Sequence, residues 1–484
     1  MLIILAFLHA ISDSQPIPLE DVFHMFRFRT RNNTNSQPQA RHSSVVTPKQ
    51  RLLKVLPIAV ALALPTASHA YDFGPFSLNG FAKYELNTGN SRCLDCQLFP
   101  DEDKQRFWAD ELVPGSPYGR KTLNGTLIQP YIGVKFDLGK GFKLSGLLSQ
   151  RWRDGKADIA GFLYEKNIAL SHEDYGSLRI GDMTTRTWSV ADYPYATNLN
   201  VSPFWSDSGA GYGLIKDGFR YTSRVLDVLE GDLVLEGTYS AGDTDFKIHK
   251  PMFLELYTQF HRGDLVVDAM YQNTRNGRPS AWSHGPFYAP ADSVKDDAKI
   301  GGSAQSIAMA MARYQVNDKI EVTGGIRRNY WSGAYAVQTQ PEILNNLGVQ
   351  TQPGLFNPMF NVDWGGTRNG VMNPGYSATS YDEMLGVRYR MGKWIPSAAI
   401  VHLGKASTDN PSERGQSNSA TVGTLGLNYD FGNGLNLYGN ANLVHYGRLG
   451  LSPLSMPGNS AFTNVDSRVN QNGVWVILGG TFVF

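Results

Sequence analysis

The stretch that decides the fold is the last twelve residues of the chain, GVWVILGGTFVF, from Gly473 to Phe484. Successive side chains of a β-strand point to opposite faces of the sheet, so every second residue shares a face. Counted back from Phe484, one face of this stretch holds only apolar side chains and glycine. A buried strand of a soluble sheet fits the same pattern, although terminal residues usually fray unless they are tied down. The rest of the chain decides whether this stretch is such a buried strand of a soluble sheet.

Length and composition favour a protein built from strands. The 484 residues suffice for two or three globular domains or for one large closed barrel. The 50 glycines and 23 tyrosines are typical of strands and turns. No run of 18 apolar residues is present, so any membrane location requires strands. Two cysteines exclude a disulfide scaffold, and a net charge of +1 without a basic stripe argues against nucleic acid as a partner.

The amino-terminal part has a different character. Residues 49–70 combine a basic start, the apolar run Val55–Leu64 and the small-residue ending Ser68-His69-Ala70, which together indicate a secretory signal peptide. We expect the mature protein to be residues 71–484. A signal normally stands first, so we interpret residues 1–48 as a mis-called start or an extension absent from the mature protein.

A recurring hairpin organises the mature chain. Residues 136–146 (FDLGKGFKLSG) and 429–439 (YDFGNGLNLYG) share one pattern, in which glycine supplies the positive φ of a tight turn. Five looser versions bring the total to seven short turns, which join fourteen strands in pairs. One unpaired strand at each end, residues 76–86 and the carboxyl-terminal strand, raises the number to sixteen. The remaining connections are longer and polar.

Short turns at one end and long loops at the other are the layout of an outer-membrane barrel. The strands alternate, with Ile128, Ile132 and Phe136 on one face of a strand and Gln129 and Lys135 on the other. We therefore predict an all-β protein, a 16-stranded antiparallel transmembrane β-barrel with a third loop inserted into its lumen. Closure leaves no open sheet edge in the hydrocarbon. The alternative, a large soluble sandwich, explains neither the signal peptide nor the two kinds of turn.

At this point the mature chain resembles the general porins of Gram-negative bacteria. The resemblance covers residues 71–484 and includes the runs DYGSLRIGD (Asp174–Asp182) and DGFRYTSR (Asp217–Arg224). It implies passive diffusion of small hydrophilic solutes and ions through a homotrimer embedded in outer-membrane lipid. It also implies that the barrel-assembly machinery reads a carboxyl-terminal insertion signal that ends in Phe482 and Phe484.

Selectivity in a barrel of this width requires a structure inside the lumen. The third long loop is expected at Ser189–Lys216, and the acidic motif of enterobacterial porins is absent from it. Its acids and aromatic residues are the predicted constriction: Asp192, Asp207, Tyr193, Tyr195, Phe204 and Trp205.

A basic wall is predicted opposite this loop. We predict that residues 142–153 form a single strand. The alternation of side chains in this strand and in the two porin-like runs then places five bases on the side of the lumen: Lys143, Arg151, Arg153, Arg179 and Arg220. A charge on the lipid face costs about 2–4 kcal/mol at the bilayer midplane, which favours this orientation. Rings of charge set ion preference, so the bases favour anions. The alternative is that each base only solvates the lumen.

Two further predictions concern cysteine and metal. Cys93 and Cys96 fall in the first long loop, where a local disulfide is expected outside the cytoplasm. A zinc site would need more ligands nearby, and the sequence offers none, so no metal or cofactor is predicted.

Other functions remain open at this stage. Tyr193, Phe204 and Trp205 could form a track in a channel specific for sugars or aromatic and organic acids. An adhesive or structural barrel would work through loops 278–302 and 337–376. A lipase-type or protease barrel needs a nucleophile beside a base. The four histidines near strands, His172, His261, His402 and His445, have no such spacing. We therefore predict that the protein is not an enzyme.

Overall fold

The structure is a computed structural model of the whole chain, and its placement is defined for most of the mature part. It describes residues 71–90, 93–95, 122–157, 163–192, 214–242, 247–248, 250, 252–275, 303–333, 367–368, 371–372, 376–405, 407–408, 419–446, 468–469 and 472–484. The predicted signal peptide and the predicted extension before it lie outside the described residues.

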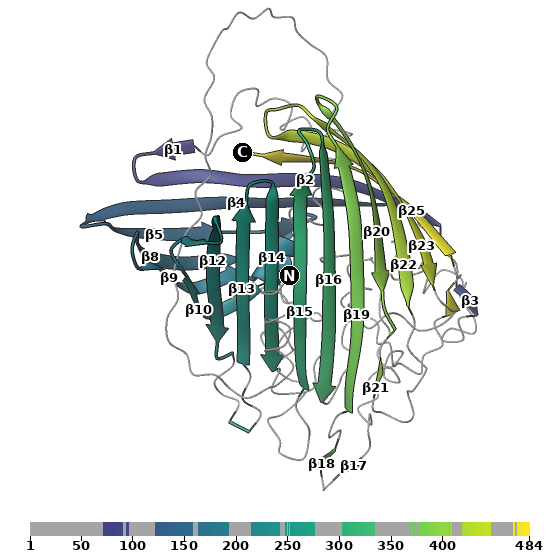
Figure 1. Ribbon diagram of the computed structural model, residues 1–484, viewed down its shortest axis with the longest axis horizontal. Helices are drawn as coiled ribbons and strands as arrows, with labels where there is room; N and C mark the ends of the chain where they lie inside the picture. Colours follow the sequence, from purple (N-terminus) through teal and green to yellow (C-terminus); the bar gives the residue numbers. More distant parts are fainter. Residues whose placement is uncertain are drawn as a thin grey trace, which may run out of the picture.

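Most of the described strands form one antiparallel barrel, and four short ones form two separate pairs (Figure 1). The main sheet has 21 strands, of which five are short pieces: β1 (Tyr71–Phe73), β6 (Trp152–Arg153), β7 (Lys156–Ala157), β11 (Leu226–Val228) and β21 (Ser407–Thr408). This leaves 21 − 5 = 16 strands in the wall. The wall strands are β2 (Phe76–Asn90), β4 (Thr122–Gly139), β5 (Phe142–Ser149), β8 (Glu165–His172), β9 (Gly176–Thr184), β10 (Leu214–Thr222), β12 (Gly231–Ser240), β13 (Met252–Arg262), β14 (Leu265–Arg275), β15 (Ser303–Gln315), β16 (Ile320–Gly333), β19 (Tyr376–Tyr389), β20 (Trp394–Leu403), β22 (Ala420–Asp430), β23 (Leu435–Tyr446) and β25 (Asn472–Val483). Each wall strand pairs with the next along the chain.

The last strand closes the barrel on the first. β25 pairs with β2 from Val474 opposite Asn90 to Val483 opposite Phe81. Beyond β25, the backbone N–H of Phe484 donates to the carbonyl of Gly80 at 3.0 Å, and the N–H of Gly80 donates to the carbonyl of Phe484 at 2.8 Å. The terminal residue is therefore tied into the sheet, and the predicted 16-stranded closed barrel is confirmed.

The two predicted glycine hairpins form as expected. Gly139 and Gly141 stand at positive φ in the β4–β5 turn, and Gly432 and Gly434 do so in the β22–β23 turn. Seven short turns lie at one end of the barrel, whereas the third long connection joins β9 to β10 at the other. A side chain at Gly141 would also meet the ring of His172, since an added Cβ would lie 2.8 Å from its Nε2.

The two faces of the wall differ as the alternation predicted. On β4, Ile128, Ile132 and Phe136 are exposed on the outer face, whereas Gln129 is buried on the inner face. The largest exposed apolar side chains of β22, β23 and β25 repeat this arrangement. Aromatic side chains gather on the outer face near the short turns, at Phe136, Phe142, Tyr389, Trp394 and Phe431. The sheet thus carries an apolar outer surface with an aromatic rim, as a membrane barrel requires.

Two strand predictions need correction. The first wall strand reaches Asn90, four residues beyond the predicted end. The predicted single strand 142–153 is interrupted, because β5 ends at Ser149 and the short β6 (Trp152–Arg153) follows a break.

Among the described residues, no helix is long and apolar enough to cross a membrane.

Candidate functional site

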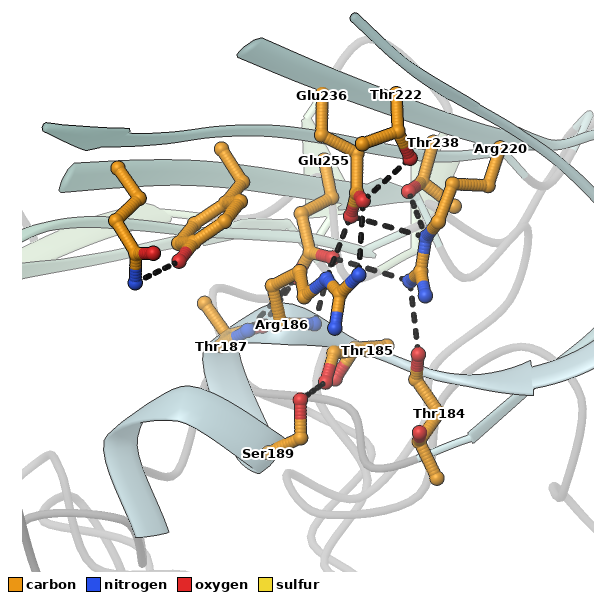
Figure 2. A network of polar contacts seen from close by, with 12 residues as sticks. Thr184, Thr185, Arg186, Thr187, Ser189, Arg220, Thr222, Glu236, Thr238 and Glu255 are labelled. Atoms are coloured by element: carbon orange, nitrogen blue, oxygen red, sulfur yellow. Dashed lines mark hydrogen bonds and ion pairs between the residues drawn. The ribbon is translucent and has the colours of Figure 1, made fainter. Parts of the chain in front are cut away.

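The third long connection begins inside the barrel with a short helix fastened to the wall. The helix α3 (Arg186–Asp192) follows β9 directly, so the loop starts earlier than the predicted Ser189. Figure 2 shows its first turn facing Glu236 of β12 and Glu255 of β13, two side chains on the inner face of the wall. We call the group Arg186, Thr187, Arg220, Glu236 and Glu255 the latch.

Glu255 caps the helix from a distant strand. The backbone N–H of Arg186 donates to its Oε1 at 2.8 Å, and the N–H of Thr187 donates to its Oε2 at 3.0 Å. The Thr187 hydroxyl adds a bond of 2.6 Å to the same Oε2. The first N–H groups of a helix lack partners within the helix, and a carboxylate beside them also meets the positive end of the helix dipole. The wall therefore supplies a carboxylate cap for the first turn of α3.

Glu236 holds two arginines. Arg186 donates through Nε at 2.7 Å and through Nη2 at 2.9 Å, which is the bidentate arrangement of a guanidinium on a carboxylate. Arg220 approaches from β10, with its Nε 3.1 Å from Oε1 of Glu236 and its Nη2 3.7 Å from Oε1 of Glu255. The Thr222 hydroxyl donates to Glu236 at 2.7 Å. Two arginines and two glutamates therefore balance in charge.

Arg186 lies beyond the end of β9, outside the membrane-spanning strands. Burial acts to lower its pKa, but the charge of Glu236 and the hydrogen bonds to it outweigh burial and hold that pKa above its ordinary value. The latch is thus an ion pair that persists across the pH range in which Glu236 is ionised. An apolar cluster of Met183, Ile215 and Phe253, each almost fully buried, joins β9, β10 and β13.

Two of the five predicted wall bases come together. Arg220 belongs to the latch, and it also donates to the Thr238 hydroxyl at 2.9 Å and to the Thr184 carbonyl at 2.8 Å. Arg179 of β9 stands directly opposite Arg220 in the strand register. Within the described part of the chain, the one hydrogen bond of its guanidinium goes to Oδ1 of Asn167, at 2.5 Å. Among the described residues, Arg179 is therefore the base at this site that has no carboxylate at ion-pair distance.

The other three bases have contacts of their own, and a basic wall of all five opposite the loop stays a prediction. Arg151 stands at the break after β5, where it is buried and donates to the Tyr164 hydroxyl at 3.0 Å. Arg153 is exposed in β6. Lys143 lies at the short-turn end of β5, with its Nζ 3.5 Å from Glu173.

Several predicted residues lie wholly or in part outside the described part of the chain. Asp192 ends α3, but its side chain is outside the described part, as are Tyr193, Tyr195, Phe204, Trp205 and Asp207. Cys93 begins the short strand β3 (Cys93–Asp95), but its side chain and Cys96 also fall outside it. Phe482 and Phe484 stack with ring centroids 5.9 Å apart at the closing seam. In the described ranges, no group of three or more metal-ligating side chains of His, Cys, Asp or Glu occurs.

Sequence reasoning missed a second buried ion pair on the inner wall. Arg327 of β16 donates to Oδ2 of Asp382 of β19 through Nε at 2.9 Å and through Nη2 at 2.7 Å. The amide of Asn329 donates to the same oxygen at 2.7 Å, and the N–H of Gly404 donates to Oδ1 at 3.0 Å. Arg327 faces inward by the same parity that was used for Arg220, so alternation along β16 was a signal that could have found it.

Comparisons with known proteins agree with the fold. The chain matches no family model, and no curated protein matches it. The outer-membrane expressed OmpT of Vibrio cholerae matches with a TM-score of 0.50 at 11% identity, over 86% of this chain and 100% of that one. The anion-selective porin from Comamonas acidovorans has a TM-score of 0.49 at 13% identity, over 84% of this chain and 99% of that one. A mutant of the Rh. blastica porin has a TM-score of 0.42 at 13% identity, over 84% of this chain and 100% of that one.

At such low identity, likeness to the Vibrio cholerae protein concerns the fold alone. It agrees with the sixteen-stranded antiparallel barrel closed by its last strand, which is an architecture of outer-membrane proteins.

Proposed function

We propose that this protein is a passive diffusion channel for small hydrophilic solutes and ions in a bacterial outer membrane. The observation that carries the proposal is a barrel of porin width whose third connection starts on the inner wall, latched by Glu236 and Glu255. Sixteen strands enclose an aqueous channel. A loop fixed to the wall narrows that channel at a defined place, which a purely adhesive barrel does not need.

Several features of the proposal come from the porin resemblance. They are export by a signal peptide cleaved near Ala70, a homotrimer in outer-membrane lipid, and insertion by the assembly machinery through the strand ending in Phe482 and Phe484. We also propose that the protein is not an enzyme. His402 and His445, two of the histidines considered above, bond Thr421 and Asn472 on the outer face, away from the latch. A channel specific for sugars or for aromatic and organic acids is the second candidate, through Tyr193, Phe204 and Trp205.

Single-channel conductance of the mature protein, purified from membranes and placed in a planar bilayer, tests the proposal. A diffusion channel gives ohmic openings that no single solute class blocks. A folded barrel without conductance would contradict the proposal. Saturable block by one class of sugar or organic acid would favour the specific channel instead.

A weak preference for anions is expected to depend on Arg179. The latch arginines are neutralised by glutamates, whereas Arg179 faces the lumen with only Asn167 as a described partner. Replacing Arg179 with glutamine should lower the permeability of chloride relative to potassium, measured as the reversal potential under a salt gradient. Arg153→Gln is the matched control, because Arg153 is exposed in β6, away from the latch. Equal reversal potentials in both variants would contradict the assignment.

The cap on α3 should affect the fluctuations of the open-channel current. In Glu255→Gln, one amide oxygen replaces a carboxylate that accepts bonds from two backbone N–H groups and a hydroxyl. The loss of a cap weakens a helix terminus by about 1 kcal/mol. We expect larger fluctuations of the open-channel current with little change in mean conductance. Glu173→Gln, at the exposed short-turn end, is the control. Unchanged current noise in Glu255→Gln would show that the cap does not restrain the loop.

A further inference from the structure

Five polar side chains form one row on the outer face of the barrel. The strand register places them directly opposite one another on five neighbouring strands. In order from β19 to β25 they are Glu383, His402, Thr421, His445 and Asn472. We call them the polar row. No other described set of outward polar side chains runs in register across these five strands, whose outer faces otherwise carry mostly apolar residues.

Apolar side chains lie directly beneath the polar row, toward the short turns. Two residues further along the same faces stand Leu385, Ile400, Leu443 and Val474, all exposed. On β23 the 445 − 435 = 10 residues from Leu435 to His445 rise about 24 Å, at about 3.4 Å per residue and a tilt of about 45°. The lipid-facing band of such barrels is about 25 Å tall. His445 therefore stands where the wall leaves the hydrocarbon on the side of the long loops.

The contacts within the polar row leave several of its hydrogen-bonding groups exposed. Nδ1 of His402 lies 2.9 Å from the Thr421 hydroxyl, and Nδ1 of His445 lies 2.8 Å from Oδ1 of Asn472. These contacts hold both rings in place and occupy one nitrogen of each. The second ring nitrogen of each histidine, together with the Asn472 amide and the Glu383 carboxylate, stays at the exposed surface. The row thus offers donors and acceptors side by side.

The rest of the wall is different at this end. Tyr239, Tyr271, Tyr330 and Tyr381 occupy the outer face of β12, β14, β16 and β19 toward the long loops. Aromatic rings are the usual residues at a membrane interface. Over β20 to β25 the polar row stands in their place. A partner that suits β20 to β25 must therefore be polar where it meets the row and apolar below it.

From this arrangement we infer that the polar row binds the sugar headgroup of a glycolipid, whose acyl chains lie on the apolar surface below. Imidazole, hydroxyl and amide groups beside a single carboxylate suit sugar hydroxyls. A phosphate would meet the negative charge of Glu383, and none of the five members of the row is a lysine or arginine. Arg328 of β16 stands opposite Tyr381, outside the row. The apolar surface favours a lipid over a free sugar. The inference rests on the proposed outer-membrane location.

Lipid retention by the purified full-length mature protein tests the inference. The protein is placed in phosphatidylcholine nanodiscs that contain either digalactosyl diacylglycerol, a neutral sugar lipid, or phosphatidic acid, a phosphate lipid without sugar. After detergent extraction, mass spectrometry measures the lipid that remains bound. The triple variant His402→Leu/Thr421→Val/His445→Leu removes three members of the row. His261→Leu is the control, since His261 is an exposed histidine at the short-turn rim.

We expect severalfold enrichment of the galactolipid over its bulk fraction with the wild type and with His261→Leu, and none with the triple variant. Enrichment that survives the triple variant, or its absence from the wild type, would overturn the inference. Enrichment of phosphatidic acid instead would replace sugar recognition with phosphate recognition. Heat-dependent electrophoretic mobility checks that each variant is folded, and His445→Leu alone serves if the triple variant is not. Conductance is recorded separately, so a failed channel and a failed lipid site are distinguishable.

Discussion

Replacing Glu236 with leucine should destabilise the folded barrel by about 3 to 5 kcal/mol, because removing one partner of a buried ion pair leaves the other charge uncompensated. Here two charges are left. Arg186 loses both of its bonds of 2.7 and 2.9 Å, and Arg220 loses its contact of 3.1 Å, with Glu255 at 3.7 Å as its remaining carboxylate. Glu236 itself is 4% exposed, so water cannot easily take its place.

The measurement is the urea midpoint of unfolding in detergent micelles or lipid vesicles, together with single-channel conductance. Glu230→Leu is a matched control, since Glu230 also pairs with an arginine, Arg262, but at an exposed turn. Exposed pairs contribute about 0 to 1 kcal/mol, so the control should unfold near the wild-type midpoint. Because the latch fixes α3, Glu236→Leu should also raise the mean conductance. Equal midpoints for the two variants would show that the latch does not stabilise the barrel.

The double variant Glu236→Leu/Arg186→Leu distinguishes the loss of the whole ion pair from the loss of one of its partners. Apolar replacement of both partners of a buried pair is often neutral, whereas removal of one is costly. Stability should therefore recover in part, while Arg220 still lacks Glu236. The conductance should stay high, since α3 no longer has its side-chain contact with β12. Recovery of stability without recovery of conductance would assign the stability effect to charge burial and the conductance effect to the loop.

The barrel itself was predictable because its signals are local. A period of two residues along each strand and glycine at each tight turn repeat many times, so single errors do not change the architecture. Ile132 and Gln129 of β4 illustrate this, since alternation alone assigns them to the outer and inner faces, where the structure places them. The closing seam was predictable for a similar reason, because an apolar strand at the very end of the chain needs a partner.

The latch was not predictable, because its members are far apart in sequence. Arg186 and Glu236 are 50 residues apart, and Arg186 and Glu255 are 69 apart. Parity along β12 puts Glu236 inside, opposite to Leu235, but it does not name the partner. The break after Ser149 did not upset the alternation along 142–153. Tyr131 pairs with Ser149 and Ile128 pairs with Trp152 in one unshifted register, so Trp152 shares the outer face with Ile128 and Arg153 stands on the opposite side.

The seam also yields a sharp test of how the chain closes. Gly80 of β2 lies against the carboxyl terminus, where an added Cβ would be 2.6 Å from the carbonyl oxygen of Gln129, 2.8 Å from Cα of Pro130 and 2.8 Å from the ring of Phe484. Two of these neighbours are backbone atoms, so a rotamer change cannot relieve the contact. Overpacking of this kind costs about 1 to 3 kcal/mol. It would also disturb the paired hydrogen bonds between Gly80 and Phe484.

Gly80→Ala should therefore lower the yield of folded barrel and its urea midpoint, measured by heat-dependent mobility after refolding into vesicles. Gly423→Ala is the control, since it makes the same change on the outer face of β22, where no atom lies within 4 Å of the added Cβ. That variant should match or slightly exceed the wild type, because glycine in a strand costs about 0.5 to 1 kcal/mol relative to alanine. If both variants fold equally well, the contact between the two ends of the chain does not limit closure. If Gly80→Ala alone fails, pairing of the last residue with the first wall strand is the step that completes the barrel.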